Sequence, residues 1–240
     1  MVNRIKAVIL AGGLGTRLYP LTRIIPKCMF PVDGKPLLEH IIKYLARYNF
    51  REIIITLGKK HEQVSSYFGD GSRYNVSLQY SIERKALGTA GSFKNAEKFL
   101  QGTTLVMQGD TLTNFDLEKI VAFHKKRRSV ATIALTLVKD PTGYGVAAID
   151  RRGRITRFKE KPTKEFFSNL VNSGIYVLEQ EILNYIPKNI MFDFSKNLFP
   201  KLLKKKLPLY GIKVDGYWFD IGTPESYKSA KDYLRNYLGN

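Results

Sequence analysis

A glycine-rich stretch that follows a short apolar run constrains this chain more than any other feature. Residues 7–10 are apolar, and they lead directly into Ala11-Gly-Gly-Leu-Gly-Thr-Arg17. This order predicts a buried strand that ends in a loop, and glycines in such a loop expose backbone N–H groups without side chains that would keep a ligand away. Residues 1–32 contain no Asp or Glu, but they contain Arg4, Lys6, Arg17, Arg23 and Lys27. The stretch therefore predicts a binding site for a polyphosphate.

Two familiar phosphate-binding motifs match the stretch poorly. The segment Gly13-Leu-Gly-Thr-Arg-Leu18 lacks the final small residue of the dinucleotide fingerprint. Gly34-Lys35 is followed by Pro36, so it is not the Gly-Lys-Ser/Thr of an ATPase loop. A purely structural turn is the remaining alternative, and the basic residues without acids favour the anion site over it.

The composition fits one α/β domain and limits the cellular setting. A chain of 240 residues can bury a large core. A single cysteine, Cys28, excludes an internal disulfide and is typical of a reducing cytoplasm; its apolar neighbours predict a packed residue and not a nucleophile. The N-terminal apolar run is too short for a signal peptide, and no segment reaches the roughly 20 apolar residues that cross a bilayer. We expect a cytoplasmic protein with no membrane partner.

The net charge of +18 raises the alternative of nucleic-acid binding. Basic runs occur at residues 125–128, 151–152 and 204–206. None of them is interleaved with aromatic residues, as RNA-binding motifs are. We therefore interpret them as solvated surface and expect no nucleic-acid partner.

Apolar runs alternate with amphipathic stretches, which predicts a mostly parallel α/β sheet. The first half predicts strands near residues 5–10, 52–57, 76–81 and 104–107, and helices that begin near Pro36, His61, Ala90 and Asp116. The second half predicts hairpin-forming strands at 130–138, 143–149 and 154–158, followed by a helix that is capped near Asp193 or Ser195, a strand at 207–214 and a closing helix from Pro224.

Several segments together resemble one enzyme family. Leu10-Ala-Gly-Gly-x-Gly-Thr-Arg17-Leu-x-Pro-Leu-Thr22, followed by Pro26-Lys27, resembles the signature of the sugar-1-phosphate nucleotidylyltransferases, or NDP-sugar pyrophosphorylases. Gly109-Asp110, Glu160-Lys-Pro162, Asn172-Ser-Gly-Ile-Tyr176 and Gly216-Tyr-Trp-Phe-Asp220-Ile-Gly-Thr-Pro224 are similar to its other motifs. The resemblance covers about residues 5–230 and is closest to the mannose-1-phosphate and manno-heptose-1-phosphate guanylyltransferases.

The resemblance implies a fold and a domain organisation. We expect a Rossmann-like, three-layer α/β/α nucleotidyltransferase domain with a central mixed, mostly parallel sheet and a small sugar-binding β subdomain. Its nucleotide-binding half would cover about residues 1–128, and its sugar-binding half and closing helix about residues 129–240. Hexapeptide repeats are absent from the sequence, so a left-handed β-helix domain is not expected, and formation of a homo-oligomer is left open.

The resemblance also implies a role for each matching residue. Arg17 would hold the leaving pyrophosphate, Lys27 the α-phosphate and Lys161 the sugar phosphate, while Asp110 and Asp220 would bind Mg²⁺ as the cofactor. The nucleotide would contact Leu10, Ala11, Gly12, Gly13, Gly15, Thr16, Glu83, Gly88 and Thr89. The sugar would contact Gly145, Glu160, Lys161 and Asn172.

The base and the sugar follow less directly. A carboxylate at Glu83 could accept hydrogen bonds from the N1–H and the exocyclic amine of guanine, which favours GTP. The predicted reaction is then GTP and mannose 1-phosphate to GDP-mannose and pyrophosphate, with small-molecule substrates as the partners. The alternatives are a manno-heptose-1-phosphate guanylyltransferase, a glucose-1-phosphate thymidylyl- or uridylyltransferase or, from a different class, a non-catalytic nucleotide sensor or nucleic-acid-binding module.

Overall fold

The computed structural model describes residues 5–13, 15–19, 21–163 and 166–237, which belong to two compact units of interleaved segments. The first unit consists of Met1–Ile5, Leu87–Val106 and Phe115–Asp215. The second unit consists of Lys6–Ala86, Met107–Asn114 and Gly216–Asn240. Each candidate site below lies within one of these units.

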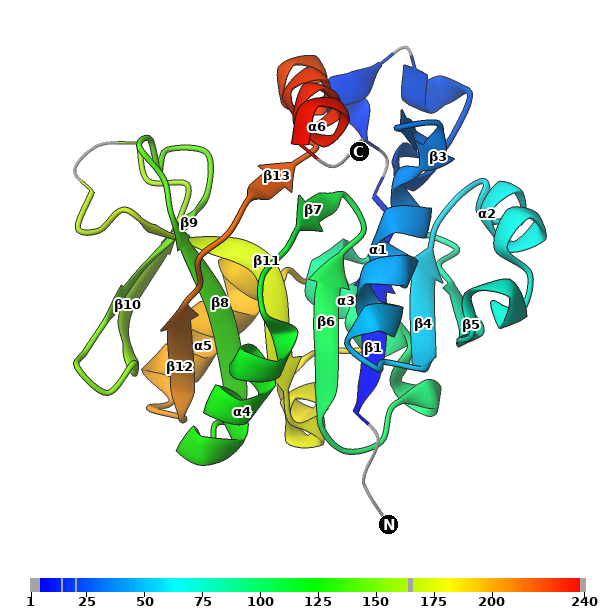
Figure 1. The fold of residues 1–240 in the computed structure, drawn as a ribbon. Helices are drawn as coiled ribbons and strands as arrows, with labels where there is room; N and C mark the ends of the chain where they lie inside the picture. Colours follow the sequence, from blue (N-terminus) through cyan, green and yellow to red (C-terminus); the bar gives the residue numbers. More distant parts are fainter. Residues whose placement is uncertain (1–4, 14, 20, 164–165, 238–240) are drawn as a thin grey trace. The chain divides into compact units, whose positions relative to one another are not determined.

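The second unit is built around three parallel strands, β1 (Lys6–Leu10), β4 (Glu52–Leu57) and β5 (Ser77–Ile82). Nearly every residue of β1 and β4 is buried, as continuous apolar runs in a parallel sheet require. Helix α1 (Leu37–Arg47) lies in front of β1 and β4 in Figure 1. It buries a stripe of apolar side chains at helical spacing, which consists of Leu37, Leu38, Ile41, Ile42 and Leu45.

Short elements complete the second unit. An antiparallel ribbon joins β7 (Thr111–Thr113) to β13 (Trp218–Asp220), and helices α2 (His61–Phe68) and α6 (Pro224–Tyr237) follow β4 and β13 in the chain. The helix expected to begin near Pro36 begins at Leu37. Pro36 is extended, with φ −55° and ψ 139°, because it pairs with Pro31 in the two-residue ribbon of β2 (Pro31–Val32) and β3 (Lys35–Pro36).

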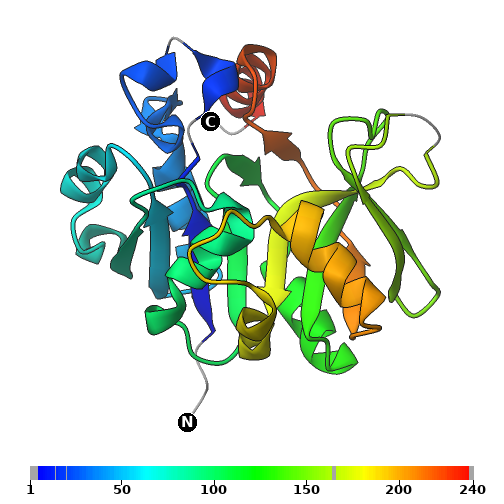
Figure 2. The same ribbon diagram turned by 180° about the vertical axis from the view of Figure 1, so that it is seen from behind.

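The first unit is mostly antiparallel. Strand β11 (Leu170–Leu178) pairs with β8 (Ala131–Leu137) and with β9 (Gly145–Ile149), and β9 forms a hairpin with β10 (Ile155–Glu160). Strand β12 (Leu209–Lys213) lies parallel to β8. Helix α4 (Leu117–Arg127) is in front of these strands in Figure 1 and α5 (Phe199–Lys204) is in front of them in Figure 2, so the two helices cover opposite faces.

Three elements of the first unit bear on the sites below. Helix α3, which the sequence predicts to begin near Ala90, runs over Gly88–Asn95. The single helix expected between Asp193 and Lys204 is a π-helical turn, Phe194–Leu198, that continues into α5. Strand β6 (Thr104–Gln108) is divided between the units after Val106.

The observed pairings confirm the predicted α/β class with a mixed sheet. Parallel pairs run through β1, β4 and β5, and antiparallel pairs through β8, β11, β9 and β10. The division into functional halves stays a prediction. No helix in the described part of the chain has the length and apolar composition that a membrane crossing needs.

Candidate active site

The glycine-rich loop leaves β1 at the carboxyl edge of the parallel strands. Ala11 N–H donates to Thr56 O at 3.0 Å, and Gly109 N–H donates to Leu10 O at 2.8 Å, so neighbouring strands hold the start of the loop. Ligands bind at this edge in open α/β sheets. In the part of the chain that the structure describes, the N–H groups of Gly12 and Gly13 have no hydrogen-bond partner. These groups are therefore available to a ligand.

Glu83 lies directly against this loop. Glu83 is 7 % exposed, and a Cβ added to Gly12 would lie 2.7 Å from Glu83 Oε1. Only glycine permits this approach, because a real Cβ would overlap the carboxylate. The structure thus brings together two residues that the sequence assigned to the nucleotide site.

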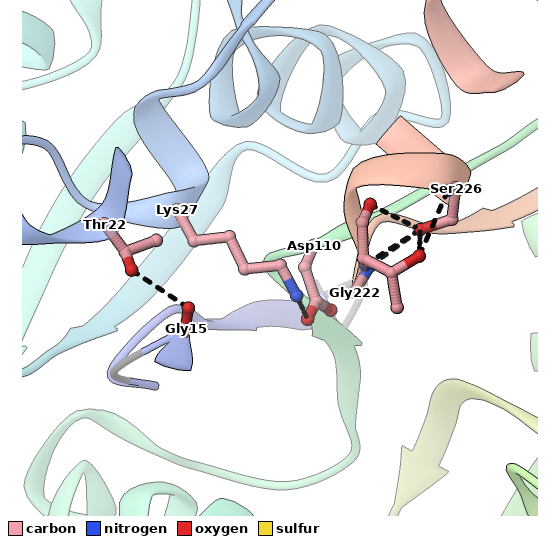
Figure 3. Close-up of polar contacts among 7 residues, drawn as sticks. Gly15, Thr22, Lys27, Asp110, Gly222 and Ser226 are labelled. Atoms are coloured by element: carbon pink, nitrogen blue, oxygen red, sulfur yellow. Dashed lines mark hydrogen bonds and ion pairs between the residues drawn. The ribbon is translucent and has the colours of Figure 1, made fainter. Parts of the chain in front are cut away.

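The rest of the loop is held by internal bonds. Gly15 has φ +61°, and its carbonyl oxygen accepts from Leu18 N–H at 2.9 Å. The same oxygen accepts from the Thr22 hydroxyl at 2.9 Å (Figure 3). Lys60 Nζ in turn donates to Thr22 O at 3.0 Å. Thr16 opens a 3₁₀ turn, Thr16–Leu18. Lys60 was not predicted as a functional residue, and it anchors the loop from the start of α2.

Lys27 and Asp110 form a close ion pair. Lys27 Nζ lies 2.5 Å from Asp110 Oδ2, and the two side chains point toward one another in Figure 3. The lysine side chain is only 12 % exposed, whereas that of Asp110 is 31 % exposed. A nearly buried ammonium group therefore neutralises a carboxylate that remains accessible to a ligand.

Asp110 and Asp220 lie next to each other despite their separation in the sequence. Ile221 N–H donates to Asp110 O at 2.9 Å, and Asp220 is paired with Thr111 between β13 and β7. Asp110 immediately precedes β7 and Asp220 ends β13, and two neighbouring carboxylates offer the hard oxygen ligands that Mg²⁺ prefers. The described residues contain no group of three His, Cys, Asp or Glu that could hold a metal, so the remaining ligands would have to be substrate oxygens and water.

Arg17 lies beside the segment that follows Asp220. A Cβ on Gly222 would lie 3.0 Å from Arg17 Nη2, so the guanidinium group packs against this glycine. The hydroxyl of Ser226 accepts from Gly222 N–H at 3.1 Å and from Thr223 N–H at 3.0 Å (Figure 3), which fixes the turn. Arg17 therefore adds a cation close to the two acids.

A cavity of about 310 Å³ opens beside the glycine loop. Ala11, Gly12 and Gly13 line one part of it. Its charged lining is basic and consists of Arg23, Lys27, Lys59 and Lys60. Lys59 and Lys60 were not predicted as site residues. Their signal is position: Gly58-Lys-Lys follows a buried strand, as the glycine loop does, and the carboxyl ends of parallel strands meet at one edge of a sheet.

Residues predicted to contact a sugar form a cluster in the first unit. Asn172 Nδ2 donates to Ser195 Oγ and to Tyr176 Oη, both at 2.9 Å. A Cβ on Gly145 would lie 2.9 Å from Glu160 Oε2, so this carboxylate approaches the backbone closely. The structure thus places Gly145 with Glu160, and Asn172 with Ser195.

Burial raises the pKa of Glu160 above its usual value. Positive charge from Lys161 and Lys196 and a hydrogen bond with Ser195 oppose this shift, and the negative charge of Asp193 adds to it. Lys161 itself is exposed and has φ +43°, and its N–H donates to Tyr144 O at 2.9 Å. An exposed ammonium beside a half-buried carboxylate can meet a phosphate and a hydroxyl of one ligand.

Gly88 and Thr89 form the first turn of α3. Thr89 N–H donates to Asp193 Oδ1 at 3.0 Å, and its hydroxyl lies 3.3 Å from the same oxygen and accepts from Phe194 N–H at 2.9 Å. The N–H and the hydroxyl of Thr89 are therefore bonded within the protein, and a contact of Gly88 and Thr89 with a nucleoside stays a prediction. Asp193 and Ser195 were predicted only as helix caps.

The comparison with known families agrees with these features. A model of the family described as nucleotidyl transferase matches residues 6–236. The chain belongs to this family.

Relatives similar to this chain are named for different bases. The chain is 37 % identical over 98 % of its length to a UTP–glucose-1-phosphate uridylyltransferase of Synechocystis sp., of which it covers 65 %. It is 36 % identical over 97 % of its length to the D-glycero-α-D-manno-heptose 1-phosphate guanylyltransferase of Aneurinibacillus thermoaerophilus, of which it covers 100 %. A putative glucose-1-phosphate thymidylyltransferase structure from Bacillus anthracis is 30 % identical, with a TM-score of 0.88 over 97 % of this chain and 96 % of that one.

The single cysteine of this chain is buried, as predicted. Cys28 is 3 % exposed, and burial raises its pKa to about 12. A thiol with so high a pKa is protonated at neutral pH and is a poor nucleophile. The chemistry of the site therefore belongs to its charged and backbone groups.

Proposed function

We propose that this chain transfers a nucleoside monophosphate from GTP to a sugar 1-phosphate and releases pyrophosphate. The observation that carries the proposal is the grouping of Lys27, Asp110 and Asp220 with a glycine loop in which the N–H groups of Gly12 and Gly13 have no partner among the described residues. Family membership supports a nucleotidyl transfer, and the Glu160–Asn172 cluster supports a sugar as the acceptor.

The reaction needs alignment and charge screening more than proton transfer. A sugar phosphate oxygen is already anionic, so no general base is required for attack on the α-phosphorus. The attacking and leaving oxygens must be held in line while negative charge from several phosphates accumulates. In this proposal Lys27 contacts the α-phosphate, Arg17 the leaving pyrophosphate and Lys161 the sugar phosphate.

Mg²⁺ would be held by Asp110 and Asp220, and when bound it screens the phosphate charges and orients them for displacement. The close backbone spacing of the two acids fits this ion. Lys27 is positioned to move its ammonium group from Asp110 to a phosphate, because a Lys side chain is a flexible point charge. The N–H groups of Gly12 and Gly13 would bond the nucleotide directly.

The chemistry of Glu83 favours guanine, whereas the similarity to named relatives does not distinguish between the bases. Relatives named for uridylyl, guanylyl and thymidylyl transfer are similar to this chain at 30–37 % identity, so identity does not select the base. A buried carboxylate against the loop accepts two hydrogen bonds, and guanine presents two adjacent donors on its Watson–Crick edge, whereas uracil and thymine present one. We therefore propose GTP as the nucleotide.

The proposed sugar has the manno configuration. Mannose 1-phosphate is the first candidate, and D-glycero-α-D-manno-heptose 1-phosphate is the second, because a relative named for it is matched over its whole length. Glucose 1-phosphate with dTTP or UTP is the alternative within the same reaction class.

The decisive experiment is a substrate matrix. Pyrophosphate release is measured with GTP, UTP, dTTP, CTP and ATP against mannose, manno-heptose and glucose 1-phosphates in the presence of Mg²⁺. We expect GTP with a manno-configured sugar phosphate to give the highest kcat/KM. Turnover with UTP or dTTP and glucose 1-phosphate alone would replace the proposed substrates. Absence of turnover with every pair would reject the enzyme and leave a nucleotide-binding module.

A further inference from the structure

Asp193 begins a helix whose backbone it does not cap with its side chain. It precedes the π-helical turn Phe194–Leu198, where an Asp side chain ordinarily accepts from one of the first free N–H groups. No such bond is formed by its carboxylate in this described segment. The Asn197 side chain instead accepts from Asp193 N–H at 2.8 Å, and Leu198 N–H donates to Asp193 O at 3.0 Å. The Asp193 carboxylate is therefore directed to another element.

That element is the beginning of α3, which has no cap of its own. Leu87 precedes the helix, and its apolar side chain cannot accept a hydrogen bond. Thr89 N–H belongs to the first turn, where N–H groups have no partner within the helix. Asp193 Oδ1 accepts from it at 3.0 Å, across a sequence separation of 104 residues. A carboxylate at this end of a helix is also favoured by the helix dipole.

The backbone around Asp193 fits closely against the same turn. Phe192 N–H donates to Leu87 O and Gly91 N–H donates to Phe192 O, both at 2.8 Å. Gly88 has φ +70°, and a Cβ at this position would lie 2.9 Å from Phe192 O and 3.0 Å from Asp193 Oδ1. Residues 192–194 therefore determine the position of Gly88 and Thr89.

The same short segment reaches the sugar-side cluster. Ser195 accepts a hydrogen bond from Asn172 and hydrogen-bonds Glu160. The Asp193 charge also acts on Glu160. One segment thus contacts residues assigned to the nucleotide and residues assigned to the sugar, all within the first unit.

We propose that Asp193 is a positioning residue that sets the Gly88–Thr89 turn for nucleotide binding. This inference rests on the proposed function, because it assumes that the turn contacts the nucleotide. Thr89 anchors the turn through its bonds to residues 193 and 194, and the turn held in this way contacts the nucleotide. Ser195, two residues further on, transmits the position of the same segment to the sugar-side cluster.

The main test compares nucleotide affinity in two variants that change a carboxylate to an amide. Asp193→Asn keeps the shape but removes the charge-assisted bond to Thr89 N–H. Asp150→Asn is the matched control, since Asp150 Oδ1 also accepts from backbone N–H groups, those of Arg152 and Arg154, in an exposed turn. Binding of GTP is measured by calorimetry, together with KM and kcat for both substrates. We expect Asp193→Asn to raise the Kd of GTP about 10-fold, with a smaller change in kcat, and Asp150→Asn to leave it within about twofold.

Hydrogen exchange separates positioning from a general loss of stability. Asp193→Asn should increase exchange of the Thr89 amide and its neighbours in α3, while α4 and α5 keep their protection. Thr89→Val serves as a second variant if Asp193→Asn does not fold, and it should raise the Kd of GTP in the same direction. Ser195→Ala should instead raise KM for the sugar phosphate with little change in the Kd of GTP.

The outcomes distinguish this inference from the proposed function. An unchanged Kd of GTP in Asp193→Asn, with faster exchange at Thr89, would overturn the positioning role while the enzyme still turned over. A wild-type protein that binds GTP but gives no product would reject the proposed reaction and leave the affinity comparison intact. A wild-type protein that does not bind GTP would overturn both.

Discussion

The two regions that sequence reasoning assigned to the nucleotide use their polar groups in opposite ways. At the glycine loop of the second unit, the N–H groups of Gly12 and Gly13 have no partner among the described residues. At the start of α3 in the first unit, Thr89 N–H and its hydroxyl are both bonded to the segment of Asp193. The donors of the first region are available to a ligand, whereas those of the second region form hydrogen bonds that hold a turn in place.

This difference separates residues that contact a ligand from residues that orient others. A substitution in the first region removes a charge or a hydrogen-bond donor that would contact the ligand, so it should change turnover. Substitution at the second region displaces a turn and should act on affinity. The comparison therefore predicts effects of different size and kind.

The largest effect is expected for Asp110→Asn. The change removes one of two adjacent carboxylates and leaves Lys27 without its ion-pair partner. Loss of charge stabilisation at a phosphoryl-transfer site costs on the order of 10³-fold in kcat. Pyrophosphate release measures this loss of kcat, and circular dichroism shows whether the variant is folded. A variant with near-normal kcat would show that Asp110 takes no part in the reaction.

Lys27→Met should reduce kcat by about 10²-fold, since a single oriented cation is lost from the phosphates. The ion pair adds a second, opposite expectation. Because Lys27 Nζ occupies Asp110 Oδ2 at 2.5 Å, the variant without nucleotide should bind Mn²⁺ more tightly than the wild type. Electron paramagnetic resonance of free Mn²⁺ measures this directly. Weaker metal binding in Lys27→Met would show that the pair does not compete with a cation.

Glu83→Gln should lower the preference for GTP over ATP and UTP by about 10-fold, because one acceptor of the carboxylate is replaced by a donor. The expected change lies in the ratio of kcat/KM values and not in the rate with every nucleotide. Parallel kinetics with the three nucleotides measure this ratio. If all three fall equally, Glu83 supports the loop through its contact with Gly12 and does not select the base.

Most of the fold could be predicted because its signals are local. The buried strands β1 and β4 and the apolar stripe of α1 were read from continuous and helical apolar patterns. The start of α1 was displaced by one residue because Pro36 pairs in a ribbon with Pro31, a contact without a sequence signal. The π-helical turn before α5 was missed for the same reason, since its irregular hydrogen bonds depend on packing.

The candidate site was predictable only where motif and position coincide. Lys27 and Asp110 carry recognisable neighbours, and the structure brings them into contact. Asp193 resembled an ordinary helix cap, because an N-cap and a cap provided to a distant helix use the same residue type. No local pattern encodes a pairing across a sequence separation of 104 residues, so only the folded chain reveals it.

The smallest predicted effect concerns pH and the first unit. The folded-state pKa of Glu160 is raised by burial, so between its usual value of 4.5 and the raised value the folded protein binds more protons than the unfolded chain. The contribution of Glu160 to stability is therefore present at low pH and lost as pH rises through that window. Glu160→Gln, which does not titrate, should unfold at an equal or higher temperature than the wild type at neutral pH.

The effect of pH on sugar binding has the opposite direction, because an ionised carboxylate accepts from sugar hydroxyls more strongly than a protonated one. KM for the sugar phosphate should rise about threefold as pH falls through the window in the wild type and change less in Glu160→Gln. Both proteins share the titration of the sugar phosphate itself, so the difference between their profiles isolates the carboxyl group. Identical profiles would show that Glu160 positions Ser195 without contacting the sugar.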